Sequence, residues 1–220
     1  MEVKEVFKGV YRIDRRLATL NLIPGMRVYG EELITVNGRE YRTWNPYRSK
    51  LSAAIMKGLK NMGIKSGADV LYLGAATGTT ASHISDIVAE KGSVYCIEIS
   101  ERSMRDLLKT CERRKNMLPM LEDARLTNSY AYDVGSVDIL YQDVSAKDQA
   151  DIFIRNSVFL KKGSFAYVAI KSQSIDVSRR PESVYAEFIS KVSMHMKLVE
   201  KTILEPYDRM HLFAVFQKPY

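Results

Sequence analysis

From Asp69 to the C-terminus, short apolar runs alternate with segments of helical periodicity. The apolar runs predict strands at 69–74, 94–99, 117–122, 137–143 and 164–170. Helices are predicted between them at about 79–90, 101–115 and 147–160, and again at about 181–195. The strand segments are almost continuously apolar, as in parallel strands covered on both faces. This alternation predicts a doubly wound, Rossmann-like α/β sheet.

Two further β-rich runs, KLVEKTILEP and HLFAVFQK, close the chain. Only a short turn at 206–209 separates them, so they should pair antiparallel as a terminal hairpin. Five parallel strands and this hairpin predict a seven-stranded sheet.

The first 45 residues have a different pattern, with alternating runs and the hairpin signal Asn37-Gly38. They predict a small antiparallel module of four or five strands. We therefore expect an N-terminal β module at 1–46 and a second domain at 47–220. The latter opens with RSKLSAAIMKGLKNMG, which predicts a helix capped by Ser49 and ended by Gly63.

Composition excludes several classes of protein. Apolar residues make up 46% and charged residues 27% of 220 residues, which is typical of a globular chain and not of a disordered one. Neither a membrane-length apolar run nor a signal-peptide pattern is present, so we expect an intracellular protein. Cys96 and Cys111 have no CxxC partners, which argues against a zinc site or a disulfide framework.

The net charge of +7 is concentrated in the first part of the chain. Residues 1–60 hold twelve Lys or Arg against six acidic residues. A basic flank favours a polyanionic partner, nucleic acid first, although a solvated basic surface would have the same composition.

A glycine turn, Gly74-Ala75-Ala76-Thr77-Gly78, joins the strand at 69–74 to the next helix. Such a turn brings backbone N–H groups and a helix N-terminus to the carboxyl edge of a sheet, where ligands bind. It matches neither G-x-G-x-x-G nor the Gly-Lys-Ser/Thr ending of a P-loop. A dinucleotide and a triphosphate are therefore poor candidates.

Two acids point to a nucleoside instead. Glu98 ends the second strand, where a carboxylate can accept ribose hydroxyls. Asp123, followed by Ala124, ends the third, where a carboxylate can face an adenine amino group. A nucleoside with a zwitterionic tail, S-adenosylmethionine (SAM), fits this edge. Singly, each feature is equally explained by a tight turn and a solvated acid.

The carboxyl ends of the fourth and fifth strands carry Asp143 and Lys171. Partial burial favours the neutral amine of a lysine, which can act as a base towards a hydroxyl, with Asp143 orienting it. Lys50 and His211 could converge on the same edge. Taken singly, Lys50 is better explained as a solvated helix residue and His211 as a packing or turn residue. Lys171 can also be a snorkelling lysine at a strand end, and Asp143 the N-cap of the following turn.

Several segments together resemble the fibrillarin family in its archaeal form. They are TWNPYRSKLSAAI, VLYLGAATGTTASHISDIV, VYCIEIS, PMLEDAR, VDILYQDVSAKDQADI and PYDRMHLFAVFQK. The resemblance implies the class I methyltransferase fold and SAM-dependent 2′-O-methylation of ribose in rRNA and tRNA, within a box C/D guide ribonucleoprotein. It also implies a cytoplasmic protein, because the Gly/Arg-rich tail of the nucleolar form is missing.

The resemblance carries site residues over by position. It implies a catalytic Lys-Asp-Lys-His tetrad, and cofactor contacts on and around the glycine turn that begins at Gly74. The tetrad falls on Lys50, Asp143, Lys171 and His211. The cofactor residues fall on Ala75, Thr79, Thr80, Glu98, Asp123, Ala124, Asp143 and Gln149.

The resemblance further implies three partners: a Nop-domain scaffold protein, a kink-turn-binding protein of ribosomal type and a guide RNA that selects the target. Two alternatives stay open from the residues alone. One is a SAM-dependent methyltransferase with a protein or small-molecule acceptor. The other is a non-catalytic RNA-binding subunit that has the same fold.

Overall fold

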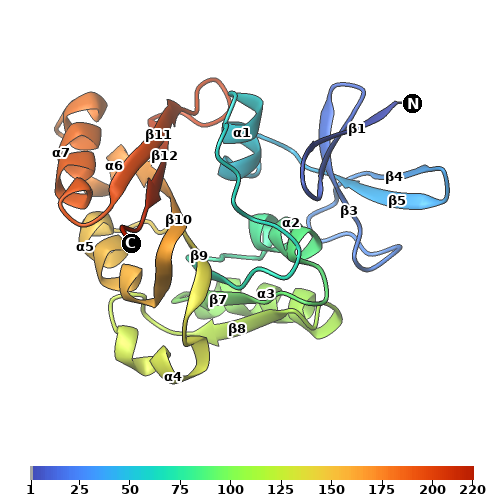
Figure 1. The fold of residues 1–220 in the computed structure, drawn as a ribbon, viewed down its shortest axis with the longest axis horizontal. Coiled ribbons are helices and arrows are strands. Elements are labelled where there is room, and N and C mark those ends of the chain that lie inside the picture. The colour runs from blue at the N-terminus through green and yellow to red at the C-terminus, as the bar shows by residue number, and fades with distance from the viewer. Residues whose placement is uncertain (1) are drawn as a thin grey trace.

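The computed structural model describes residues 2–220, and within them the chain forms two separate sheets (Figure 1). The smaller, five-stranded sheet is antiparallel, with the order β1-β2-β3-β5-β4. Its strands are β1 (Val3–Phe7), β2 (Val10–Ile13), β3 (Arg16–Leu20), β4 (Leu33–Val36) and β5 (Arg39–Thr43). Asn37 and Gly38 both have positive φ between β4 and β5, as the Asn-Gly hairpin signal requires.

The larger sheet has seven strands in the order β11-β12-β10-β9-β6-β7-β8. They are β6 (Val70–Leu73), β7 (Val94–Glu98), β8 (Met117–Leu121), β9 (Val137–Gln142), β10 (Leu160–Lys171), β11 (Lys197–Ile203) and β12 (His211–Gln217). β6 to β10 run parallel, and β12 is antiparallel to both β10 and β11. The predicted parallel sheet with a terminal hairpin is confirmed. Because β6 lies between β7 and β9, the strand order reverses there, where open α/β sheets bind ligands.

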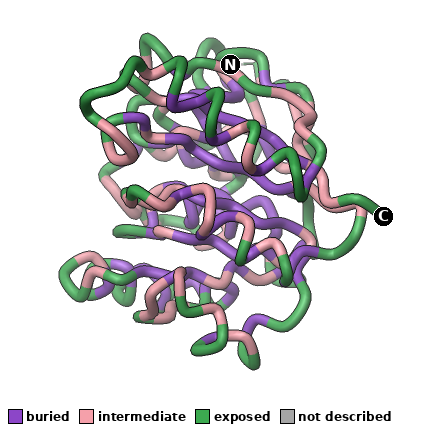
Figure 2. The backbone as a smooth tube through the Cα atoms, turned by 90° about the vertical axis from the view of Figure 1, so that its left-hand side faces the viewer, coloured by how far each residue is buried: buried purple, intermediate pink, exposed green. Residues whose placement is uncertain are grey.

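Helices cover both faces of this sheet. On one face lie α1 (Lys50–Met56), α2 (Thr79–Val88) and α3 (Glu101–Arg113); on the other lie α4 (Ala131–Val134), α5 (Gln149–Asn156) and α7 (Pro181–Ser193). The short α6 (Ser172–Ile175) follows β10 directly. Buried residues lie in the interior of the molecule and exposed residues in its outer turns (Figure 2). No helix within residues 2–220 is long and apolar enough to cross a bilayer.

Two helices are shorter than the sequence pattern indicates. α1 ends at Met56 and not before Gly63. Gly58 takes a φ of +94°, and the amides of Gly58 and Leu59 bond to the carbonyls of Ile55 and Ala54, which closes the helix with a Schellman motif. α5 ends at Asn156, where a 3₁₀ turn at Ser157–Phe159 leads directly into β10.

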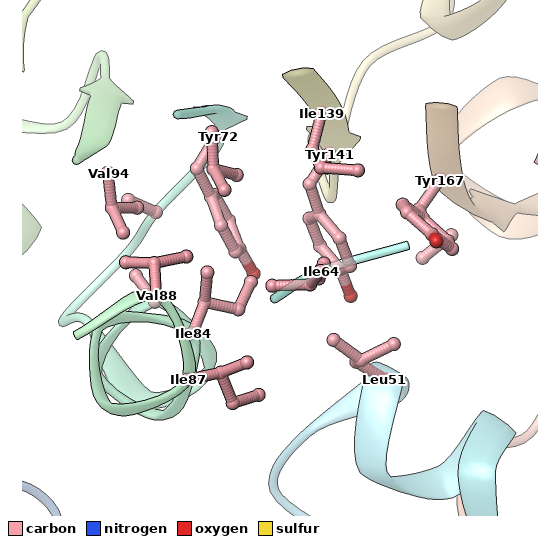
Figure 3. Packing of buried hydrophobic residues seen from close by; sticks show 14 of the residues in the cluster. Leu51, Ile64, Tyr72, Ile84, Ile87, Val88, Val94, Ile139, Tyr141 and Tyr167 are labelled. Atoms are coloured by element: carbon pink, nitrogen blue, oxygen red, sulfur yellow. The ribbon is translucent and has the colours of Figure 1, made fainter. Parts of the chain in front are cut away.

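Three tyrosines form a ladder across the sheet. Tyr72, Tyr141 and Tyr167 are register partners on β6, β9 and β10. The rings of Tyr72 and Tyr141 stack with centroids 4.5 Å apart. Figure 3 shows the three rings side by side, directed towards Leu51 of α1 and Ile84 of α2. This packing fixes both helices against the strands that end at the candidate site.

A buried charge network joins the small sheet to the large one. Asp86 of α2 accepts hydrogen bonds from Arg42 of β5 at 2.8 Å and from Arg114 after α3 at 2.6 Å. Arg42 also donates to Glu31 at 2.6 Å. All four side chains are almost fully inaccessible to solvent. Arg42 thus belongs to the interior, although the sequence counts it in the basic flank; the division of the chain at residue 46 stays a prediction.

His83 of α2 lies within this network and has to be neutral. Its ring bonds to the hydroxyls of Thr19 and Tyr29, each at 2.7 Å. Burial holds the pKa of His83 well below its ordinary value, and the charges of Arg42 and Arg114 lower it further. Protonation of His83 would therefore oppose folding.

We expect the free energy of unfolding to fall as the pH drops below about 6.5, because His83 takes up a proton only in the unfolded chain. The loss from this group is up to about 1.4 kcal/mol per pH unit. Urea unfolding between pH 7.5 and 5.0 measures the slope. His83→Gln should flatten it, whereas the same change at the exposed His195 should leave it intact; equal slopes in all three proteins would contradict the assignment.

Candidate active site

A cavity of about 290 Å³ lies at the carboxyl ends of β6, β7, β8 and β9. One residue from each strand end lines it: Gly74, Glu98, Asp123 and Asp143. Ala124 belongs to the same wall. The predicted convergence of these five residues at one sheet edge is therefore what the structure shows. Carboxylates dominate the polar lining, which suits hydroxyl and amino donors better than phosphate.

Glu98 fixes the shape of the glycine turn. Its Oε2 accepts the amide N–H of Ala76 at 2.7 Å, and its Oε1 accepts that of Ser100 at 2.8 Å. Ala76 has a φ of +48°, so the turn is held in a conformation that non-glycine residues adopt at a cost. Each carboxylate oxygen keeps a lone pair for a ligand hydroxyl.

A second cavity, of about 230 Å³, adjoins the first at the glycine turn. Its walls include Ala75, Thr79 and Thr80, together with Arg48 and Lys50. It shares four residues with the first cavity: Gly74, Ala76, Asp143 and Lys171. The first cavity thus offers mainly carboxylates and the second mainly cations. Asp143 and Lys171 line both cavities and mark their boundary.

Asp143 joins two lysines from distant parts of the chain. Lys171 Nζ lies 2.8 Å from its carboxylate and donates to its backbone carbonyl at 2.8 Å and to Ser145 Oγ at 3.1 Å. Lys50 Nζ lies 3.2 Å from the same carboxylate. The side chains of Asp143, Lys171 and Lys50 are only 14%, 13% and 19% exposed, so their charges are poorly screened.

Lys50 is a cation in this arrangement. Burial lowers the pKa of Lys50, but the carboxylates of Asp143 and Asp208 more than offset it, so the pKa lies above its ordinary value. Ser49 caps α1 by accepting the amide N–H of Ser52, and Thr80 of α2 donates to the Ser49 hydroxyl at 2.9 Å. The predicted cap is confirmed, and it holds the first turn of α1 against α2.

His211 reaches the site through a residue that the sequence analysis missed. His211 is the register partner of Lys171 across β12 and β10. Its Nδ1 lies 3.0 Å from the carboxylate of Asp208, and Lys50 lies 3.6 Å from that same carboxylate. Asp208 therefore bridges Lys50 and His211. The only local signal for it is an acid three residues before the candidate histidine.

Gln149 lies beside the site and is not among the residues that line either cavity. It is fully buried, and its side-chain amide bonds to backbone groups of Ala146 and Lys171. It clamps the loop after β9 to the end of β10. The structure thus places Gln149 in contact with the backbone of Lys171 and in the lining of neither cavity.

Comparison with known proteins identifies the family. A family model described as Fibrillarin matches residues 1–219. The chain belongs to the fibrillarin family. The fibrillarin resemblance carried by the sequence segments is thereby confirmed, together with the class I methyltransferase fold that it implied.

Similar proteins agree with this membership. The chain is 47% identical to the fibrillarin-like rRNA/tRNA 2′-O-methyltransferase of Pyrococcus furiosus, over 98% of each chain. It superposes on the Aeropyrum pernix fibrillarin with natively bound S-adenosyl-L-methionine, with a TM-score of 0.88 and 44% identity, covering 98% of this chain and 99% of that one. A fibrillarin/Nop5p complex matches with a TM-score of 0.88 and 37% identity, over 98% and 100% of the chains.

We expect Gly74→Ala to destabilise the fold more than Gly58→Ala. Both glycines have positive φ, which costs a side-chain-bearing residue about 1–2 kcal/mol. A Cβ at Gly58 meets open space, whereas one at Gly74 would lie 2.8 Å from the Asp143 carbonyl oxygen. Overpacking should add about 1–3 kcal/mol at Gly74. Urea unfolding of both variants measures the difference, and equal losses would contradict this close approach.

Proposed function

We propose that this fibrillarin-family chain transfers the methyl group of SAM to the 2′-hydroxyl of ribose in rRNA and tRNA. The observation that carries the proposal is the pair of cavities with Asp143 and Lys171 between them. The carboxylate-lined cavity fits a nucleoside donor, and the cation-lined cavity fits an RNA acceptor. The names of the similar proteins support the same reaction.

The first cavity supplies the contacts for the donor. We assign Glu98 to the ribose hydroxyls and Asp123, with Ala124, to the adenine. We assign the methionine part to the boundary of the two cavities, where Gly74 lines both and Ala75, Thr79 and Thr80 line the second. No lysine lies in the glycine turn itself, which agrees with a ligand that carries no phosphate. Gln149 is assigned an indirect role through its bonds to Lys171.

The bound donor supplies a methyl group on a positively charged sulfur, which is already a good leaving group. The chain then has to align the 2′-hydroxyl with that methyl and direct the departing hydroxyl proton. Alignment of this kind contributes roughly 7–11 kcal/mol, and a positioned base adds about 10²–10⁴-fold. The carboxylate of Asp143 is within 3.2 Å of both lysine ammonium groups.

We assign Lys171 as the proton-directing group, oriented by Asp143. Lys171 Nζ donates to the Asp143 carbonyl and to Ser145 Oγ and lies 2.8 Å from the Asp143 carboxylate. It can therefore pass one of its protons to that carboxylate as its nitrogen takes up the proton of the 2′-hydroxyl. Lys50 remains charged and is suited to the ribose and its adjacent phosphate. His211, held by Asp208, is assigned to the same task.

We propose that a Nop-domain scaffold protein, a kink-turn-binding protein and a box C/D guide RNA assemble with this chain, with the guide choosing the nucleotide. The fibrillarin/Nop5p complex supports the first of these. We also propose a cytoplasmic location, since the similar curated proteins come from archaea. Residues 1–46 are proposed as a structural module.

Reconstitution with scaffold protein, kink-turn-binding protein, box C/D guide RNA and a complementary target tests the proposal. Labelled SAM should methylate one ribose that moves when the guide sequence moves. Lys171→Ala should lose at least 10²-fold in rate and still bind SAM, whereas Lys162→Ala, exposed on the same strand, should stay active. Unchanged turnover in Lys171→Ala would overturn its role. Labelling of protein or small-molecule pools instead of RNA would overturn the acceptor.

We expect Glu98→Ala to weaken SAM binding at least tenfold, or about 1.4 kcal/mol. The variant loses the proposed ribose contact and also releases the amides of Ala76 and Ser100. Isothermal calorimetry measures the dissociation constant. Glu112→Ala, an exposed acid on α3, is the matched control, and wild-type affinity in Glu98→Ala would contradict the cofactor placement.

A further inference from the structure

One guanidinium ties together the loops on two sides of the first cavity. Arg125 follows β8 and is among the residues that line the cavity. Its Nε and Nη2 donate to the two oxygens of Asp148 at 2.9 Å and 2.8 Å, a bidentate pair. Asp148 ends the loop that follows β9. The side chain of Arg125 therefore links the loop after β8 to the loop after β9.

The same guanidinium also touches the proposed adenine acceptor. Arg125 Nη1 lies 3.3 Å and 3.4 Å from the oxygens of Asp123, and its amide N–H donates to Asp123 Oδ1 at 2.9 Å. These bonds restrict the rotamer of Asp123 and engage Oδ1 most strongly. Oδ2 has only the longer contact and is the freer acceptor for a ligand.

A second arginine fixes the backbone at this point. Arg155 of α5 donates to the carbonyl of Arg125 at 2.8 Å. The hydrogen bonds from Arg125 hold the pKa of Asp148 below its ordinary value. A lone exposed ion pair contributes little, but here two carboxylates share one planar donor, and the pair bridges two loops. The Arg125–Asp148 pair therefore stabilises the site only while the two loops stay close together.

We propose that Arg125 and Asp148 form a latch across the cofactor cavity, and that the latch sets how long the methyl donor stays bound. The proposal rests on the assignment of this cavity to SAM. With the latch formed, Asp123 is oriented and the loops after β8 and β9 are held together. With the latch broken, both loops can separate and the donor can leave. Arg125 is a positioning residue, since the Asp143 centre lies outside its contacts.

Arg125→Ala should raise the SAM dissociation rate and the dissociation constant about tenfold, while kcat at saturating SAM changes less than twofold. Arg125→Lys should have an intermediate dissociation rate, because lysine keeps the positive charge but cannot form the bidentate pair with Asp148. Stopped-flow displacement of SAM measures the rate, and methylation by the reconstituted complex measures kcat and KM. Arg105→Ala removes an exposed arginine of α3 and should match the wild type.

Two further measurements separate a latch from a general loss of structure. Asp148→Ala alone should resemble Arg125→Ala, and the double variant should be no worse than either single one. Higher salt should speed SAM release from the wild type and have little effect on Arg125→Ala. An unchanged dissociation rate, or a fall in kcat without a change in binding, would overturn the latch. Failure of the wild type itself to bind SAM would instead overturn the proposed function.

Discussion

The carboxylate of Asp143 is the centre on which the site depends. It lies at the end of β9, and it draws in one ammonium group from α1 and another from the end of β10. The two ammonium groups depend on Asp143, because its removal would leave them close together without their shared counter-ion in a medium that screens weakly. Gly74 makes the arrangement possible, since its missing Cβ lets the backbone after β6 approach the Asp143 carbonyl.

The charged centre depends on the position of α1, and α1 is connected through α2 to the small sheet. Lys50 begins α1, whose cap is tied to α2 through Ser49 and Thr80. The other face of α2 carries Asp86, which holds Arg42 of the small sheet and Arg114 after α3. The N-terminal module is thus joined to the same helix that positions the site. Its buried ion pairs favour a specific docking geometry more than they favour stability.

The two cavities divide the chemistry of the chain in a simple way. Acids line the side that we assign to the donor, where hydroxyl and amino groups have to be recognised. Cations line the side that we assign to the acceptor, where a phosphate backbone has to be held. Contacts from such cations to phosphate position an RNA without reading its base sequence. Arg125 is a cation on the donor side, where its charge is paired with Asp123 and Asp148.

The amino-acid sequence by itself determined the strands and longer helices, the two sheets and the four strand-end residues Gly74, Glu98, Asp123 and Asp143; the short α4 and α6 were not predicted. This was possible because hydrophobic periodicity and turn chemistry act locally, and because parallel strands necessarily bring their carboxyl ends to one edge. The end of α1 was misjudged, since Gly58 and Gly63 carry the same local signal and only the packing after Met56 distinguishes them.

Only the tertiary structure decided which side chains meet. Asp208 became part of the site because β12 lies antiparallel to β10 and turns it towards Lys50. Arg42 became an interior residue because its partners Asp86 and Glu31 come from different elements. The side chain of Gln149 bonds to backbone groups, and Arg125 pairs with Asp148 from another loop of the cavity. Such pairings depend on distances between segments remote in the chain, and no spacing along the sequence encodes them.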